Sequence, residues 1–190
     1  MLPTLNNYES EDVSDCVYIN RFASASRGDI IVVHNPQNNS NANKYVIKRL
    51  IATEGDKIAI VRTDNGAVSA INGTYRISII KKGSTQAELV DEPYLEEGTS
   101  LYFTYMEFQT LINKPNLHGC KIVIVNDIKY LEINEGYIFY LGDNRSSEGA
   151  SNDCMDYGPV EASKIVGRVN IIVYPVSYTH LRAHETRHDL

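Results

Sequence analysis

The stretch that decides the fold is Tyr45-Val46-Ile47-Lys48-Arg49-Leu50-Ile51-Ala52. It is apolar or β-branched except for two adjacent cations, which predicts a buried strand rather than a helix. Because side chains alternate along a strand, Lys48 and Arg49 should point to opposite faces. Lys48 then lies among apolar neighbours, and burial disfavours its charged form. It can serve as a general base if it gives up its proton. The alternative is an edge strand whose cations discourage pairing with other chains.

Length and composition describe a globular chain. The 190 residues are 43% hydrophobic and 22% charged, enough for one domain or two small ones. A net charge of -6 without a run of Lys and Arg argues against nucleic acid as a partner. Three widely spaced cysteines form neither a disulfide framework nor a Cys-x-x-Cys metal motif. No apolar stretch reaches the length of a membrane span.

Many short apolar runs are separated by turn residues, which predicts an all-β fold with coiled antiparallel sheets or a barrel-like domain. The pattern of residues 101–112 fits either a strand or a short helix. The runs expected to be strands cover residues 30–33, 45–52, 57–62, 75–80, 121–125, 137–141, 164–169 and 170–175.

The C-terminal stretch, residues 176–190, differs from the rest of the chain and resembles a translated sequencing-library adapter. We exclude it from the fold and expect it to be disordered. His180, His184 and His188 lie there at a spacing of four residues, and we expect no metal site from them.

A tight turn rich in hydrogen-bonding groups, Gly142-Asp143-Asn144-Arg145, follows the apolar run 137–141 directly. Such a turn can be an ordinary loop in which Asp and Asn satisfy their own backbone. The stretch Ser151-Asn152-Asp153-Cys154 follows it and adds further polar groups.

In this order the motifs resemble bacterial type I signal peptidase, whose serine nucleophile is activated by a lysine. The four boxes that carry the resemblance cover most of residues 1–174. The family pattern Ser-Met-x-Pro-Thr-Leu matches Met1-Leu2-Pro3-Thr4-Leu5, and Arg-Gly-Asp-Ile-Val-Val matches residues 27–32. The lysine box matches residues 45–49, and the last box, Gly-Asp-Asn-Arg then Ser-x-Asp-Ser-Arg, matches residues 142–145 and 151–155.

The departures from the family pattern carry expectations of their own. The nucleophilic serine would stand immediately before Met1, so we expect a truncated start that also lacks the membrane anchor. The polypeptide as given should then be inactive. Cys154 and Met155 replace the family Ser and Arg, so an ion pair between that Arg and Asp153 is lost.

The resemblance makes Lys48 the general base and Ser151 the hydroxyl that orients its amine. A free lysine has a pKa of about 10.4 and is charged at neutral pH, so the strand has to lower that value by desolvation. Ser151 as an ordinary loop serine remains the alternative.

Structural support is expected on the opposite face of the strand. Arg49 should form an ion pair with Asp143 and so tie the lysine strand to the turn after residue 141. The further residues expected to brace this region are Asn144, Arg145 and Asp153.

The substrates implied by the family are signal peptides with small residues before the cut, in an Ala-x-Ala-like pattern. A shallow apolar pocket would favour them, and the peptide would bind as an added strand. Plain core packing is the alternative for each residue of the pocket. Its expected walls are Met1, Leu5, Val46 and Ile47.

The expected organisation is a catalytic β-domain from residues 1–60 and 134–175, with an inserted β-domain at 61–133. The parent protein would be a monomer at the bacterial cytoplasmic membrane, with its catalytic domain on the outer face and no cofactor or metal.

Three alternatives remain. The chain could be a non-catalytic peptide-binding relic, or a self-cleaving repressor-type protease, which lacks support because no DNA-binding helices or basic surface are seen. Cys154 near a lysine could also be nucleophilic, although no His or Asn partner is evident.

Overall fold

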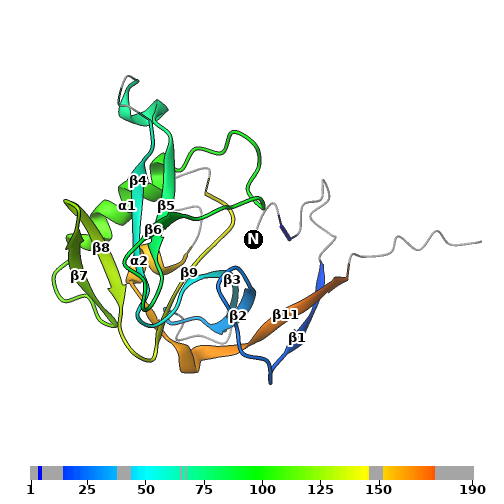
Figure 1. Ribbon diagram of the computed structural model, residues 1–190. Helices are drawn as coiled ribbons and strands as arrows, with labels where there is room; N and C mark the ends of the chain where they lie inside the picture. Colours follow the sequence, from blue (N-terminus) through cyan, green and yellow to red (C-terminus); the bar gives the residue numbers. More distant parts are fainter. Residues whose placement is uncertain are drawn as a thin grey trace, which may run out of the picture.

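The expected strands form and pair into two antiparallel sheets, as the computed structural model shows (Figure 1). The structure describes residues 4–5, 15–37, 44–64, 66, 68–145 and 152–173. The all-β prediction is therefore confirmed. The first sheet has six strands, in the order β1 (Cys16–Asn20), β11 (Ile165–Val173), β2 (Ile30–His34), β3 (Tyr45–Ala52), β9 (Tyr137–Leu141) and β10 (Val160–Glu161).

The second sheet has five strands, and the described residues also form two α-helices and two 3-10 turns. Its strand order is β6 (Ala87–Leu89), β5 (Tyr75–Ile80), β4 (Lys57–Arg62), β8 (Ile128–Ile133) and β7 (Cys120–Val125). The helical elements are η1 (Ala70–Asn72), α1 (Tyr102–Ile112), α2 (Cys154–Tyr157) and η2 (Ala162–Lys164).

Residues 102–112 are helical, which decides between the two structures that the sequence allowed. Thr104, Phe108, Leu111 and Ile112 are buried, at the spacing of one helix face. That face covers the second sheet at β4 and also meets α2. The single strand β11 likewise replaces the two strands expected over residues 164–175.

Strand β8 was missing from the sequence expectations. Asn126 and Asp127, between β7 and β8, have φ values of 50° and 63°. Two successive residues with positive φ, in the left-handed region, make the tight turn that matches the twist of a hairpin. Asn and Asp tolerate the conformation better than most residues, although Asn-Gly or Asp-Gly is the usual signal.

Strand β3 lies inside the first sheet, with β2 on one side and β9 on the other. Arg49 is paired on both sides, so the edge-strand alternative is wrong for this cation. Ile31 of β2 pairs with Lys48, and Leu141 of β9 pairs with Arg49. The pairing with β9 has an irregular register between Leu50 and Ala52.

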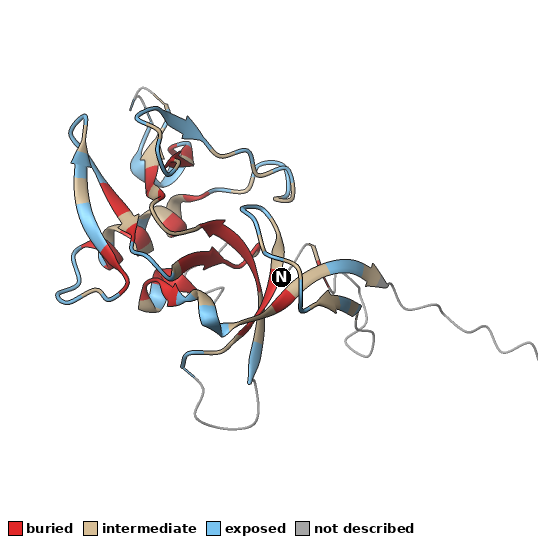
Figure 2. Cartoon of the chain, turned by 60° about the horizontal axis from the view of Figure 1, so that its bottom comes forward, coloured by how far each residue is buried: buried red, intermediate tan, exposed pale blue. Residues whose placement is uncertain are grey.

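The chain crosses between the sheets twice, at residues 53–56 and 134–136, and the crossings are hydrogen-bonded side by side. The amide of Gly55 donates to the Ile133 carbonyl at 2.8 Å, and the Ile133 amide donates to the Asp56 carbonyl at 2.9 Å. One continuous buried cluster joins both sheets, as the red segments of Figure 2 show. Strand β4 belongs to the second sheet from Lys57 onward, whereas the domain division at residues 61–133 stays a prediction.

The buried carboxylate of Asp56 fixes the first crossing. Burial alone would raise its pKa, but hydrogen bonds from the Thr53 amide, Arg27 and the Lys82 amide outweigh this and lower it. The Arg27 guanidinium lies 2.6 Å from the carboxylate. The loop before β2 is thus attached to the point where the chain leaves the first sheet.

Candidate active site

Lys48 is buried in the middle of β3, with 9% of its surface exposed. Burial lowers its pKa below the ordinary value, while four acidic groups raise it less: Asp153, Cys154, Asp156 and Asp143. Desolvation thus outweighs attraction, so the amine loses its proton more readily than a free lysine. A neutral amine in a protein interior is the form that a general base requires.

The surroundings of Lys48 are more acidic than the sequence indicated. The strand alternation placed Lys48 among apolar residues, but the carboxylate of Asp153 also acts on it. Asp153 accepts hydrogen bonds from the amides of Gly142, at 2.8 Å, and Met155, at 3.0 Å. It therefore caps α2 and fastens that helix to the turn after β9. Burial raises the pKa of Asp153 above its ordinary value.

The ion pair between Arg49 and Asp143 is present and bidentate. Nε of Arg49 donates to Oδ1 of Asp143 at 2.9 Å, and Nη2 donates to Oδ2 at 2.7 Å. Both side chains are buried, so the charges need each other. Nη1 of Arg49 also donates to the Gly28 carbonyl at 2.8 Å. The arginine thus joins the lysine box to the second box and to the last box.

Thr4 brings the first box to the same place. Its hydroxyl donates to Oδ2 of Asp143 and accepts from Nη2 of Arg49 at 3.5 Å. Leu5 beside it is buried. Stretches that are separated by more than one hundred residues in the sequence therefore meet at a single carboxylate.

Arg145 is buried beneath this cluster and contacts a residue that the sequence did not single out. Its Nε donates to the Gly142 carbonyl, and its Nη2 lies 3.1 Å from Oε1 of Glu92. Tyr94, two residues after Glu92, covers the Arg49 guanidinium, with 3.7 Å between Cζ and the ring centroid. A possible signal was the stretch from Asp91 to Leu95, where proline and apolar residues interrupt an acidic loop.

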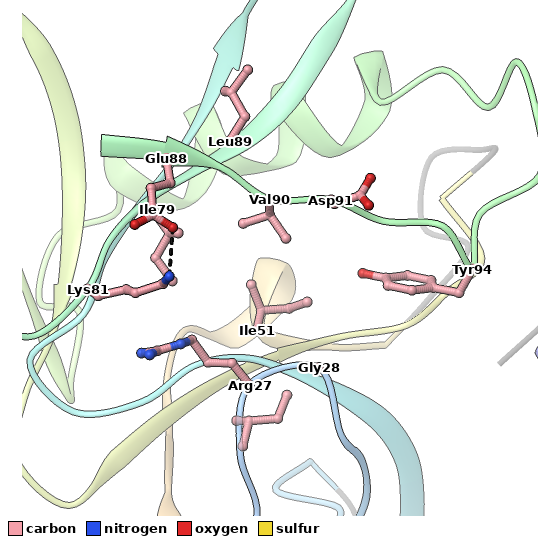
Figure 3. Close-up of a pocket in the computed structure, with 11 residues that line it drawn as sticks. Arg27, Gly28, Ile51, Ile79, Lys81, Glu88, Leu89, Val90, Asp91 and Tyr94 are labelled. Carbon is pink, nitrogen blue, oxygen red and sulfur yellow. Dashed lines mark hydrogen bonds and ion pairs between the residues drawn. The ribbon is translucent and has the colours of Figure 1, made fainter. Parts of the chain in front are cut away.

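Five predicted site residues remain to be placed. Met1 and Ser151 lie outside the described residues. Val46, Ile47 and Asn144 are half-buried. A cavity of about 270 Å³ between the two sheets is lined by Ile51, Ile79 and Tyr94 among others (Figure 3), and none of the expected pocket walls lines it. The assignment of those walls stays a prediction.

Cys154 does not have the properties of a nucleophile. The residue is fully buried, and its sulfur accepts a hydrogen bond from the Tyr140 amide at 3.3 Å. Burial raises the pKa of its thiol well above the ordinary value. Because the thiolate is the reactive form, this cysteine is inert at neutral pH.

The described residues contain no group of three or more His, Cys, Asp or Glu side chains that could hold a metal ion. None of the helices in the same ranges has the length and apolar character needed to cross a membrane.

Comparison with known proteins gave one family. A search of curated proteins found no match. The family model described as "Signal peptidase, peptidase S26" matches residues 1–174, which is nearly the whole chain. Members of this family are membrane-associated hydrolases of the serine protease class. The fold, the buried lysine strand and this match agree, and the chain belongs to the S26 family of signal peptidases.

Proposed function

We propose that this chain carries the catalytic framework of a serine endopeptidase that removes signal peptides from exported proteins, with Lys48 as its general base. Burial lowers the pKa of Lys48 and so favours the neutral amine. That amine would take the proton of a serine hydroxyl, whose oxygen then attacks the scissile carbonyl. Ser151 would orient the amine, as the family pattern implies.

The contact of Thr4 with Asp143 and Arg49 carries this proposal. In the family pattern the nucleophilic serine stands directly before Met1, four residues from Thr4. Four residues of extended chain span at most about 14 Å. Lys48 directly precedes Arg49, so the Thr4 contact would keep a serine at that position within this short span of the lysine strand.

The pairing of β3 supports binding of the substrate as an added strand. Strand β9 pairs with β3 only from Arg49 to Ala52. An extended peptide would add beside the part of β3 that precedes this pairing, with its small side chains toward the predicted walls Leu5, Val46 and Ile47.

Contact with a membrane surface agrees with the exposed side chains of β1 and β11. Tyr18 and Ile171 pair across these strands and are both exposed, as is Phe22 just beyond β1. Exposed aromatic and aliphatic side chains favour a membrane interface. Replacing Phe22 by Ser should reduce sedimentation with anionic lipid vesicles, whereas Val68→Ser, in the turn of the second sheet, should not.

The decisive test uses the full chain with one serine added directly before Met1. It should cleave a peptide that carries Ala-x-Ala before the cut, as followed by mass spectrometry. Lys48→Ala should abolish cleavage, whereas Lys44→Ala, at an exposed cation near the same strand, should not. Cleavage that survives Lys48→Ala contradicts the proposal. Saturable binding without cleavage identifies the non-catalytic relic instead.

A further inference from the structure

We propose that Glu92 and Tyr94 form a strap through which the second sheet holds Arg49 and Arg145, and that both are positioning residues for Lys48. Residues 91–95 lie between β6 and α1, so they belong to the part of the chain that builds the second sheet. The catalytic consequence rests on the function proposed above. The contacts themselves do not.

Tyr94 forms the first arm of the strap. Its ring reaches from the connection after β6 into the space between the sheets (Figure 3). The ring lies flat enough over Arg49 to bring its centroid within 3.7 Å of Cζ. A guanidinium over an aromatic face is attracted by the ring, most effectively where water is excluded. This ring contact adds to the hydrogen bonds of Arg49 with Asp143, Gly28 and Thr4.

Glu92 forms the second arm. Its side chain is 6% exposed and faces the Arg145 side chain, which is 3% exposed. The Tyr94 hydroxyl donates to the same Oε1 of Glu92 at 2.6 Å, so the two arms are joined. Among the described residues Nη1 of Arg145 has no hydrogen-bond partner, so the Glu92 carboxylate is an important balance for this buried charge, together with the attraction of Asp153.

Both arms act on the turn that carries Asp143. Arg145 donates to the Gly142 carbonyl, and Arg49 binds the Asp143 carboxylate. Lys48 precedes Arg49 in the chain and responds to Asp143. Releasing Tyr94 would let Arg49 move away from Asp143, whose negative charge would then act more strongly on the lysine. The strap should therefore affect turnover more than substrate binding.

The experiment compares Tyr94→Leu with Tyr105→Leu in the chain that carries the added serine. Tyr105 of α1 stacks on Tyr75 of β5 with 4.6 Å between the ring centroids, and it controls for the loss of a packed ring against the second sheet. We expect Tyr94→Leu to lower kcat by about 10- to 100-fold with little change in KM, because small displacements of a catalytic group have effects of this size. Tyr94→Phe keeps the ring over Arg49 and should restore kcat. Equal kcat values for the two leucine variants would overturn the proposal.

Glu92→Gln is the second variant, in case Tyr94→Leu does not fold. It keeps an acceptor for both partners and removes only the charge that balances Arg145. We expect a several-fold lower kcat at unchanged KM, and an unchanged kcat contradicts the strap.

A readout without activity separates this proposal from the function proposed above. In the chain as given, carbon-13 NMR of the Lys48 side chain reports its titration. Tyr94→Leu should move the midpoint to higher pH, because a less compensated Asp143 raises the pKa of Lys48, and Tyr105→Leu should not. If the serine-bearing chain fails to cleave, the proposed function fails while this titration still decides the strap. A midpoint that is the same in both variants overturns it.

Discussion

Strand β3 buries two neighbouring cations on its opposite faces, and the two are accommodated in different ways. Lys48 and Arg49 are almost equally exposed, at 9% and 8%. Arg49 has a bidentate carboxylate, a carbonyl and an aromatic ring around its guanidinium. For Lys48 the cost of burial exceeds the attraction of the nearby acids, and its pKa falls. An arginine cannot lose its proton in a protein and must be paired, whereas a lysine can become neutral. Lys48 and Arg49 therefore could not exchange positions without loss of the neutral amine on one face and of the ion pair on the other.

The largest effect on cleavage should come from Lys48→Arg in the serine-bearing chain, which places an arginine on both faces of β3. The charge is kept, but the side chain can no longer accept a proton. We expect kcat/KM to fall by about 10²- to 10⁴-fold, the usual contribution of a general base. Lys44→Arg is the matched control on an exposed residue. A Lys48→Arg variant with normal turnover would remove the lysine from the mechanism.

Removing the carboxylate on the other face tests how far Arg49 depends on its partner. Asp143→Ala leaves a buried guanidinium without its anion and should lower the free energy of unfolding by about 3–5 kcal/mol. Urea denaturation measures this change. Glu88→Ala breaks the exposed pair with Lys81 and should cost about 1 kcal/mol or less. Equal losses for the two variants would mean that the Arg49 pair gains nothing from burial.

Unlike Asp143→Ala, Lys48→Met should raise the free energy of unfolding at neutral pH. Because the folded-state pKa of Lys48 is lowered, the unfolded chain holds this proton more tightly. Stability of the unsubstituted chain therefore rises with pH between the lowered pKa and about 10.4. The advantage of the variant should be greatest below that window and smallest above it, as followed by urea denaturation at several pH values. An advantage that grows with pH would contradict a lowered pKa.

The smallest effect expected is a shift in the pH profile of cleavage. Asp153 is the strongest acidic influence on Lys48, and Asp153→Asn removes its charge while keeping a side-chain acceptor. The pKa of Lys48 should fall further, so the rising limb of kcat/KM against pH should move to lower pH. Asp127→Asn, in the β7–β8 turn, should leave the limb in place. A shift to higher pH in the Asp153 variant would assign the limb to another group.

Local rules of sequence were sufficient for part of this site. Strand alternation placed Lys48 and Arg49 on opposite faces, and the turn directly after a buried strand offered Asp143 as the partner of Arg49. That pair is present. Its prediction combined the side-chain alternation of the strand with the family resemblance of the two boxes.

Other parts could not be predicted because they depend on where distant segments pack. Glu92 contacts Arg145 across 53 residues of sequence, and nothing in its own stretch indicates an arginine partner. Loss of the family Arg at Met155 suggested an Asp153 without support. Backbone amides of Gly142 and Met155 supply it instead, and amides leave no trace in a residue pattern. The roles of Met1 and Ser151 stay predictions.

The positions of the two crossings in the sequence also determine which sheet can fold first during translation. All strands of the second sheet lie in the continuous segment from Lys57 to Ile133, so this sheet can be complete while the ribosome is still translating. The first sheet has to wait for β9 and for β11, which pairs with β1 across nearly the whole described chain. Glu92 and Tyr94 therefore exist in a formed sheet before Arg145 is made. We expect the nascent second sheet to act as the template on which the last box of the catalytic sheet closes.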